Sequence, residues 1–154
     1  MLRLLIQLLI MPLPWSIRRL GLKLLLGFDI APSARIGWSI ILAERVTVCA
    51  HARMGSFNFV NRLASFHLGE HAQMGSLNWL SGWPASTDYF AVDRATRDPS
   101  FRMDEHTSFS NRHLIDCNDK VHLMAFAGLG GWGTQILTHS IDLALGVQRC
   151  APVT

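Results

Sequence analysis

Residues 30–53 read IAPSAR-IGWSII-LAERVT-VCAHAR, and an apolar side chain opens each unit of six. The same period continues through residues 54–65 (MGSFNF-VNRLAS) and, after Phe66 and His67, through residues 68–85 (LGEHAQ-MGSLNW-LSGWPA). A Gly or Ala often follows the opening residue. A period of six matches neither the turn of an α-helix nor the alternation of an ordinary strand, so the repeating unit is of another kind.

Six-residue units are typical of a three-sided coil in which each unit forms one short side and sends its apolar side chain into a shared core. Three units return the chain above its own starting point, so each coil buries its neighbour. We therefore expect Ile30 to lie beside Val48, Ile36 beside Met54, and Leu42 beside Val60. The sequence predicts a mainly β solenoid of about five coils over residues 28–154.

The repeats are interrupted once. Residues 81–101 (SGWPASTDYFAVDRATRDPSF) have no period, and we expect them to form a loop insertion at one corner. Such a loop is either functional or a tolerated insertion. The period resumes over residues 103–120 and again, as LMAFAG-LGGWGT-QILTHS, over residues 123–140.

Residues 1–27 form a separate N-terminal segment with near-helical spacing of leucines among Arg18, Arg19 and Lys23. We expect residues 2–26 to form one or two amphipathic helices. The pattern favours a cap over the open end of the coil, and an interfacial membrane anchor is the alternative. The first fourteen residues (MLRLLIQLLIMPLP) lack a signal-peptide cleavage site and are too short to cross a bilayer.

Composition narrows the function classes. The chain has 154 residues and 49% apolar content, which is enough for one domain. A net charge of +3, mostly from Arg, suits a phosphorylated cofactor or an anionic membrane surface, and the absence of a basic run disfavours nucleic acid. Cys49, Cys117 and Cys150 have neither disulfide nor zinc-site spacing, which favours a reducing compartment. We expect a cytoplasmic protein, and peripheral contact to the inner membrane surface through residues 2–26 is the alternative to the cap.

The IG-x-S and MGS-x-N units, at residues 36–39, 54–58 and 74–78, resemble those of the hexapeptide-repeat acyltransferases, which are left-handed parallel β-helices. Residues 138–142 (THSID), followed by Arg149 and by residues 152–154 (PVT), are similar to the T-H-P-x-D … R … P-V-T-I-G stretch of maltose, galactoside and nodulation-type sugar O-acetyltransferases. Residues 13–15 (LPW) resemble the start of the exopolysaccharide branch of that family, which includes colanic acid acetyltransferases. Ser140 replaces a common Pro and points away from the maltose and galactoside subgroups.

The resemblance implies transfer of an acetyl group from acetyl-CoA to a hydroxyl of a sugar or polysaccharide precursor. It implies a homotrimer and no catalytic metal, and it implies that the sequence is C-terminally truncated relative to the family. His139 takes the position of the family's catalytic His. The ordinary pKa of histidine lies near neutrality, so this side chain is suited to removing a hydroxyl proton. His139 is therefore the candidate general base.

Three further residues are candidates for binding the acceptor. Asp142 is the third residue after His139, and we expect it to align either the acceptor or the His. An equal alternative is that Asp142 is a solvent-exposed residue of a turn without a binding role. Asn111 and His113 lie one coil earlier and resemble an Asn-containing stretch that lines the family's acceptor site. Gly128, Gly130, Gly131 and Gly133 fit corners of the coil rather than a phosphate-binding loop.

Two other functions stay open. Seven histidines allow a metal-dependent β-helix similar to γ-carbonic anhydrases, although their spacing shows no matching set of three ligands. A non-catalytic, truncated β-helix that serves as a scaffold is the other alternative.

Overall fold

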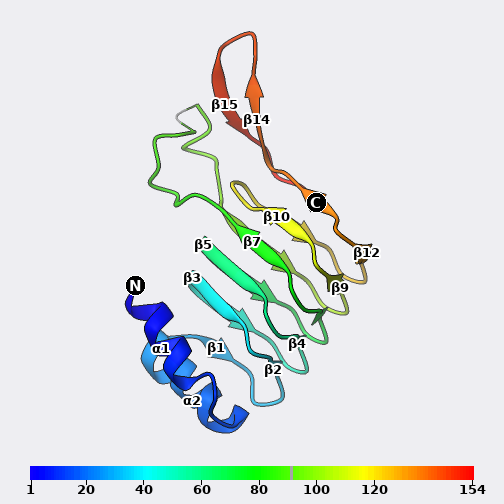
Figure 1. Cartoon of the computed structure of the whole chain (residues 1–154). Coiled ribbons are helices and arrows are strands. Elements are labelled where there is room, and N and C mark those ends of the chain that lie inside the picture. Colours follow the sequence, from blue (N-terminus) through cyan, green and yellow to red (C-terminus); the bar gives the residue numbers. More distant parts are fainter. Residues whose placement is uncertain (91) are drawn as a thin grey trace.

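Two helices precede the strands. The computed structural model describes residues 1–90 and 92–154, and helices α1 (Leu2–Ile10) and α2 (Trp15–Leu26) lie at one end of it (Figure 1). Pro12 and Pro14 separate the helices, because proline has no N–H and cannot continue a helix. Helix α2 ends at Gly27, whose φ of 70° lies in the left-handed region that glycine adopts without steric cost. The helical prediction for residues 2–26 is confirmed, as two pieces.

From Asp29 onward the chain forms a parallel β-solenoid of about five turns, which confirms the predicted fold class. Each turn passes through three rows of strands, and neighbouring strands in a row run parallel (Figure 1). The strands are β1 (Asp29–Ile30), β2 (Arg35–Ile36), β3 (Ile40–Val48), β4 (Arg53–Met54), β5 (Phe59–Leu68), β6 (Gln73–Met74), β7 (Trp79–Ser81), β8 (Ser100–Met103), β9 (Ser108–Asn111), β10 (Leu114–Asp116), β11 (Val121–Leu123), β12 (Gly128–Trp132) and β13 (Gln135–Ile136).

The register of the strands confirms two of the three predicted stacking pairs. Ile30 pairs with Val48, and Ile36 pairs with Met54. The third prediction is wrong: Ile41 pairs with Val60, and Leu42 pairs with Asn61. The β3–β5 ladder has a register shift directly after Leu42, so the sides of the coil differ in length.

The insertion lies in the third coil. Strand β7 ends at Ser81, and β8 brings the chain back into the same ladder, where Phe101 pairs with Phe66. Residues 82–99 contain no helix or strand among those that the structure describes. The predicted loop is therefore present, but Ser81 and Phe101 at its ends belong to strands.

The chain leaves the solenoid after β13. Strands β14 (His139–Asp142) and β15 (Val147–Cys150) pair antiparallel and form a hairpin that projects beyond the last coils (Figure 1). The prediction of a regular unit at residues 135–140 is wrong for its second half. A six-residue period in the sequence does not reveal an antiparallel hairpin of exposed strands.

Helices α1 and α2 cover the first coil with buried leucines of α2 and also with polar side chains that bond to its backbone. The Gln7 amide donates to the Ile41 carbonyl at 2.9 Å and accepts the Ile41 N–H at 2.8 Å. Arg18 donates to the Ile36 carbonyl, and Arg3 donates to the Ala43 carbonyl. These bonds satisfy backbone groups of the first coil that have no preceding coil to pair with.

Small residues after the opening apolar residue allow the coils to approach closely. A Cβ placed on Gly75 would lie 2.6 Å from the Ser110 carbonyl oxygen of the next coil and in contact with Asn111 Oδ1. The Asn111 Oδ1 atom accepts the Ser76 N–H at 2.7 Å, so it is fixed in that position. The close approach of neighbouring coils therefore explains why the repeat prefers Gly or Ala at this place.

Candidate active site

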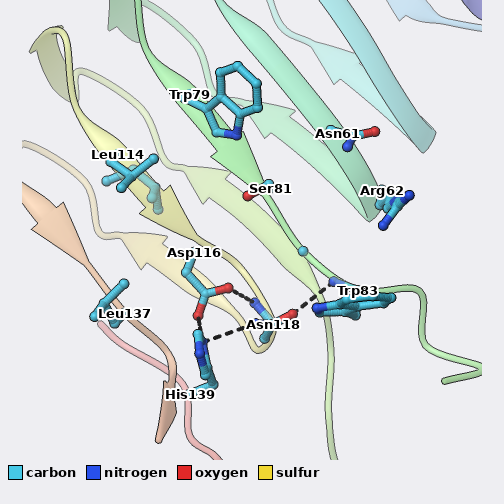
Figure 2. A pocket seen from close by; sticks show the side chains of 12 residues that line it. Asn61, Arg62, Trp79, Ser81, Trp83, Leu114, Asp116, Asn118, Leu137 and His139 are labelled. Atoms are coloured by element: carbon cyan, nitrogen blue, oxygen red, sulfur yellow. Dashed lines mark hydrogen bonds and ion pairs between the residues drawn. The ribbon is translucent and has the colours of Figure 1, made fainter. Parts of the chain in front are cut away.

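A pocket of about 370 Å³ opens where the row of strands that contains β7 and β10 meets the insertion and the hairpin. Figure 2 shows His139, Asp116 and Asn118 grouped at one end of it, with Trp79, Asn61 and Arg62 at the other. Its lining comes from β5, β7 and β10, from the start of the insertion and from the residues before and at the start of β14: Asn61, Arg62, Trp79, Ser81, Gly82, Trp83, Leu114, Ile115, Asp116, Asn118, Leu137 and His139.

His139 is paired with a carboxylate. His139 Nδ1 lies 2.6 Å from Asp116 Oδ2 and 3.1 Å from the Asn118 side-chain nitrogen (Figure 2). The Asn118 Oδ1 atom accepts the Trp83 N–H at 2.8 Å, which fixes the orientation of this amide. Because an ionised carboxylate only accepts hydrogen bonds, the short contact assigns the proton to His139 Nδ1. The protonated Nδ1 atom cannot also accept from the Asn118 NH2 group, so the 3.1 Å contact is a close approach and not a hydrogen bond. In the neutral ring, Nε2 is then the basic nitrogen.

Asp116 is itself held firmly. Its Oδ2 atom accepts the Thr138 N–H at 3.1 Å and lies 3.2 Å from the Thr138 hydroxyl, and its Oδ1 atom accepts the Asn118 N–H at 3.2 Å. The Asp116 side chain is 13% exposed and the His139 side chain 39% exposed. The carboxylate is therefore shielded while the imidazole reaches the pocket, and His139 Nε2 has no hydrogen bond to the described part of the chain.

The insertion forms a wall behind His139. The Phe90 ring packs edge-on against the His139 ring, with centroids 6.2 Å apart. Arg97 donates to the Trp83 carbonyl at 3.0 Å and to the Asn118 carbonyl at 2.9 Å, which ties the two ends of the insertion to β10's following turn. The predicted loop thus supplies one side of the site.

Asp93 of the insertion connects it to the hairpin. Its carboxylate accepts the Cys150 N–H at 2.8 Å and an Arg149 guanidinium N–H at 3.1 Å. The Cys150 N–H and the Arg149 guanidinium hold the pKa of Asp93 below its ordinary value. Arg149 belongs to the motif that resembles the sugar acetyltransferases. Through Asp93 it helps to hold β15, the second strand of the hairpin that begins at His139.

Exposed aromatic rings line the part of the pocket away from His139. Trp79 packs against Phe59 with ring centroids 4.8 Å apart, and Trp83 lies under the Arg62 guanidinium at 5.3 Å. Half-exposed indole rings beside polar groups such as Asn61 and Ser81 offer both an apolar face and hydrogen-bonding partners.

The structure places the other three predicted site residues outside this pocket. Asp142 lies at the end of β14, where its Oδ1 atom accepts the N–H groups of Ala144 and Leu145 at 3.0 and 3.1 Å. Asn111 is the residue that accepts the Ser76 N–H within the solenoid. Binding of an acceptor by Asp142, Asn111 or His113 stays a prediction, and the site built around His139 does not use them.

His113 is buried inside a corner of the solenoid. Its backbone N–H donates to Asn78 Oδ1 at 2.9 Å, its Nδ1 atom accepts the Thr134 N–H at 3.2 Å, and its Nε2 atom lies 3.0 Å from the Ser110 hydroxyl. In the preceding coils the same corner is occupied by Asn78 and Asn58. His113 thus continues a column of buried polar side chains.

We expect His113 to make the stability of the folded protein sensitive to acid, because burial lowers the pKa of this residue below its ordinary value. The unfolded chain then takes up a proton first, so stability is lost as pH falls from about 6.5 through the lower pKa of the folded state. His113→Asn, which continues the Asn column, is expected to reduce this loss by up to about 1.4 kcal/mol per pH unit. Denaturant unfolding of both proteins at pH 8 and pH 5 measures it. Identical pH dependence would contradict the assignment.

Three other histidines form a stack at one corner. The His51 and His71 rings lie 4.8 Å apart, and the His71 and His106 rings 4.9 Å apart. All three residues have φ near 60°, as the corner requires. Within residues 1–90 and 92–154, no group of three or more His, Cys, Asp or Glu side chains is placed to hold a metal ion.

Sequence reasoning missed Asp116 and Asn118. Residues 113–116 (HLID) echo residues 139–142 (HSID), but this likeness alone does not indicate that Asp116 meets His139. The strand register places Ile115 beside Ile136, so the turns that follow β10 and β13 lie next to each other and bring Asp116 to His139. Counting coil lengths from the last strands would have pointed to this pair.

Comparison with protein-family models, with curated proteins and with solved structures gave no match to this chain. The solenoid fold is therefore established by the structure, and the family stays a prediction that rests on the motifs around His139.

Proposed function

We propose that this chain is an O-acyltransferase that moves an acetyl group from acetyl-CoA to a hydroxyl of a sugar or glycan, with His139 as general base. The observation that carries the proposal is the short Asp116–His139 contact at the end of a pocket with two exposed indole rings. A histidine whose Nδ1 atom is held by a carboxylate, and whose Nε2 atom faces a pocket, is suited to removing a proton from a bound hydroxyl.

The reaction follows from this geometry. His139 Nε2 takes the proton of the acceptor hydroxyl as the oxygen forms a bond to the thioester carbonyl carbon. When the carbon–sulfur bond breaks, the imidazolium returns the proton to the CoA sulfur. Asp116 stabilises the imidazolium in between and keeps the ring oriented. The products are the acetyl ester and free CoA, and no other reactant is needed.

Aromatic and polar groups in the pocket support a sugar as the acceptor. The volume of about 370 Å³ lies in the range typical of small-molecule pockets. The apolar C–H face of a sugar ring can rest on Trp79 or Trp83, while Asn61 and Ser81 offer hydrogen bonds to its hydroxyls. Arg62, above Trp83, favours a glycan that carries a carboxylate or phosphate.

The finer assignments belong to the same proposal. We assign the chain to the hexapeptide-repeat acyltransferases, with left-handed coils, a homotrimeric assembly and a cytoplasmic site of polysaccharide synthesis. The IG-x-S and MGS-x-N units and the THSID motif support this assignment. Sedimentation analysis of the purified chain measures the assembly.

An assay of the wild-type chain tests the function. The protein is incubated with acetyl-CoA and a panel of neutral and anionic mono- and oligosaccharides, and free CoA thiol and the mass of each acceptor are followed. We expect thiol release that depends on an acceptor and yields a singly acetylated product. Release without acetylated acceptor, or none with any acceptor, would overturn the proposal.

A further inference from the structure

Helices α1 and α2 expose large apolar side chains on the faces that point away from the solenoid. Leu2, Leu5 and Leu9 form one stripe and Ile17, Leu20 and Leu24 another, because residues three and four apart share a helix face. The complete set of exposed apolar residues in this segment is Met1, Leu2, Leu5, Leu8, Leu9, Leu13, Ile17, Leu20, Leu24 and Leu25.

The helices bury one apolar face and expose a second one. Leu22 and Leu26 of α2 are buried in the core, beside Gln7 and Arg18, which bond to the backbone of the first coil. A helix that only covers the end of a domain buries its apolar face and shows polar residues to water. Covering the coil therefore gives no reason for the leucines on the outside.

Both helices lie against the first coil. Helix α1 bonds to β3 through Gln7, and α2 bonds to β2 through Arg18, so the two helices lie side by side against one coil (Figure 1). We call the exposed apolar residues given above the leucine face. So many exposed large apolar side chains in one segment are typical of an interaction site.

The charge of the segment indicates the partner. Residues 1–28 contain Arg3, Arg18, Arg19 and Lys23 and no acidic residue. Arg19 and Lys23 are at least partly exposed on α2, next to the leucine face. Asp29 and Glu44 of the first coil are balanced by Arg35 and Arg45. Leucines flanked by basic side chains match the interface of an anionic lipid bilayer, where apolar residues enter the acyl boundary and cations meet the headgroups.

We propose that the leucine face docks this protein onto the surface of an anionic membrane, with α1 and α2 lying in the interface. None of the helices that the structure describes is long and apolar enough to cross a bilayer. An interfacial helix needs only one apolar face, and two adjacent helices give a larger buried area than one. The docking rests on the leucine face alone and does not depend on acyl transfer.

Vesicle co-sedimentation of the full-length chain tests the docking. The probes are phosphatidylcholine vesicles with and without phosphatidylglycerol, at low and high salt. We expect binding to the anionic vesicles that weakens with salt. The double variant Leu20→Glu/Leu24→Glu is expected to bind about 100-fold more weakly, since each leucine kept out of the apolar layer costs about tenfold.

Leu143→Glu/Leu145→Glu is the matched control, because it adds the same charge at two exposed leucines in the hairpin turn at the other end of the molecule. Circular dichroism and the thermal midpoint verify that both variants are folded. The control is expected to bind vesicles within about twofold of the wild type. Equal loss in both variants, or no loss in Leu20→Glu/Leu24→Glu, overturns the proposal. It is also overturned if the wild type ignores anionic vesicles and light scattering shows a self-association that only Leu20→Glu/Leu24→Glu abolishes. In that case a second copy covers the leucine face.

Discussion

His139→Ala is expected to lower kcat/KM for acyl transfer about 10²- to 10⁴-fold, the contribution typical of a general base. The variant removes the nitrogen that takes the acceptor proton and leaves Asp116 and the pocket walls in place. Steady-state kinetics with acetyl-CoA and the best acceptor measure the effect. Because His139 is 39% exposed, its removal leaves no large buried cavity, and the fold should be retained.

His122 provides the matched control for this experiment. Its Nε2 atom lies 2.7 Å from Asp104 Oδ2, so it forms a second histidine–carboxylate pair in the same chain. It lies outside the pocket that contains His139. His122→Ala is expected to keep its kcat/KM within about threefold of wild type. Equal losses in the two variants would show that the activity depends on stability alone.

Asp116→Asn separates positioning from binding. The Asn cannot hold His139 in the tautomer with a basic Nε2 as a carboxylate does, so kcat should fall while the acceptor KM stays near its wild-type value. A change confined to KM would instead place Asp116 among the groups that bind the acceptor.

Gly75→Ala is expected to destabilise the protein by about 1–3 kcal/mol, the usual range for an overpacked position. The added Cβ would lie 2.6 Å from the Ser110 carbonyl oxygen, an atom of the backbone that cannot move aside without parting two coils. Gly75 comes directly after Met74, at the place where the repeat prefers small residues. The free energy of unfolding in denaturant measures the effect.

Gly130→Ala is the control, because Gly130 follows Leu129 at the equivalent place in a later coil and has no atom within 4 Å of an added Cβ. Its free energy of unfolding should stay within about 0.5 kcal/mol of wild type. If both substitutions cost the same, the cost does not come from the close approach of Gly75 to Ser110, and the packing argument fails.

The fold was largely predictable from the sequence because each coil repeats one packing problem. A side chain such as Ile30 or Val48 can enter the core only at fixed intervals, and that interval is visible in the sequence. The error at Leu42 has a clear origin: Ile41 and Leu42 are both apolar, so the pattern does not distinguish which of them enters the core. The register shift after Leu42 decides it, and it is a property of the paired strands.

The candidate site was predictable only in part. His139 stood out through the THSID motif, whereas Asp116 lies in a neighbouring coil and meets it only through the strand register. His113 was a candidate because, with Asn111, it lies in a stretch that resembles one lining the family's acceptor site. Its burial in a column with Asn78 could not be seen without knowing which way the corner turns.

The bonds from Gln7 to Ile41 also occupy part of a strand edge of the first coil. The Gln7 side-chain amide donates to and accepts from one residue of β3, as the backbone of a neighbouring strand would. An exposed strand edge is a template onto which another chain can add by β-pairing. Because Gln7 and Arg18 bond to Ile41 and Ile36, another chain could pair with these backbone groups only by displacing the two side chains.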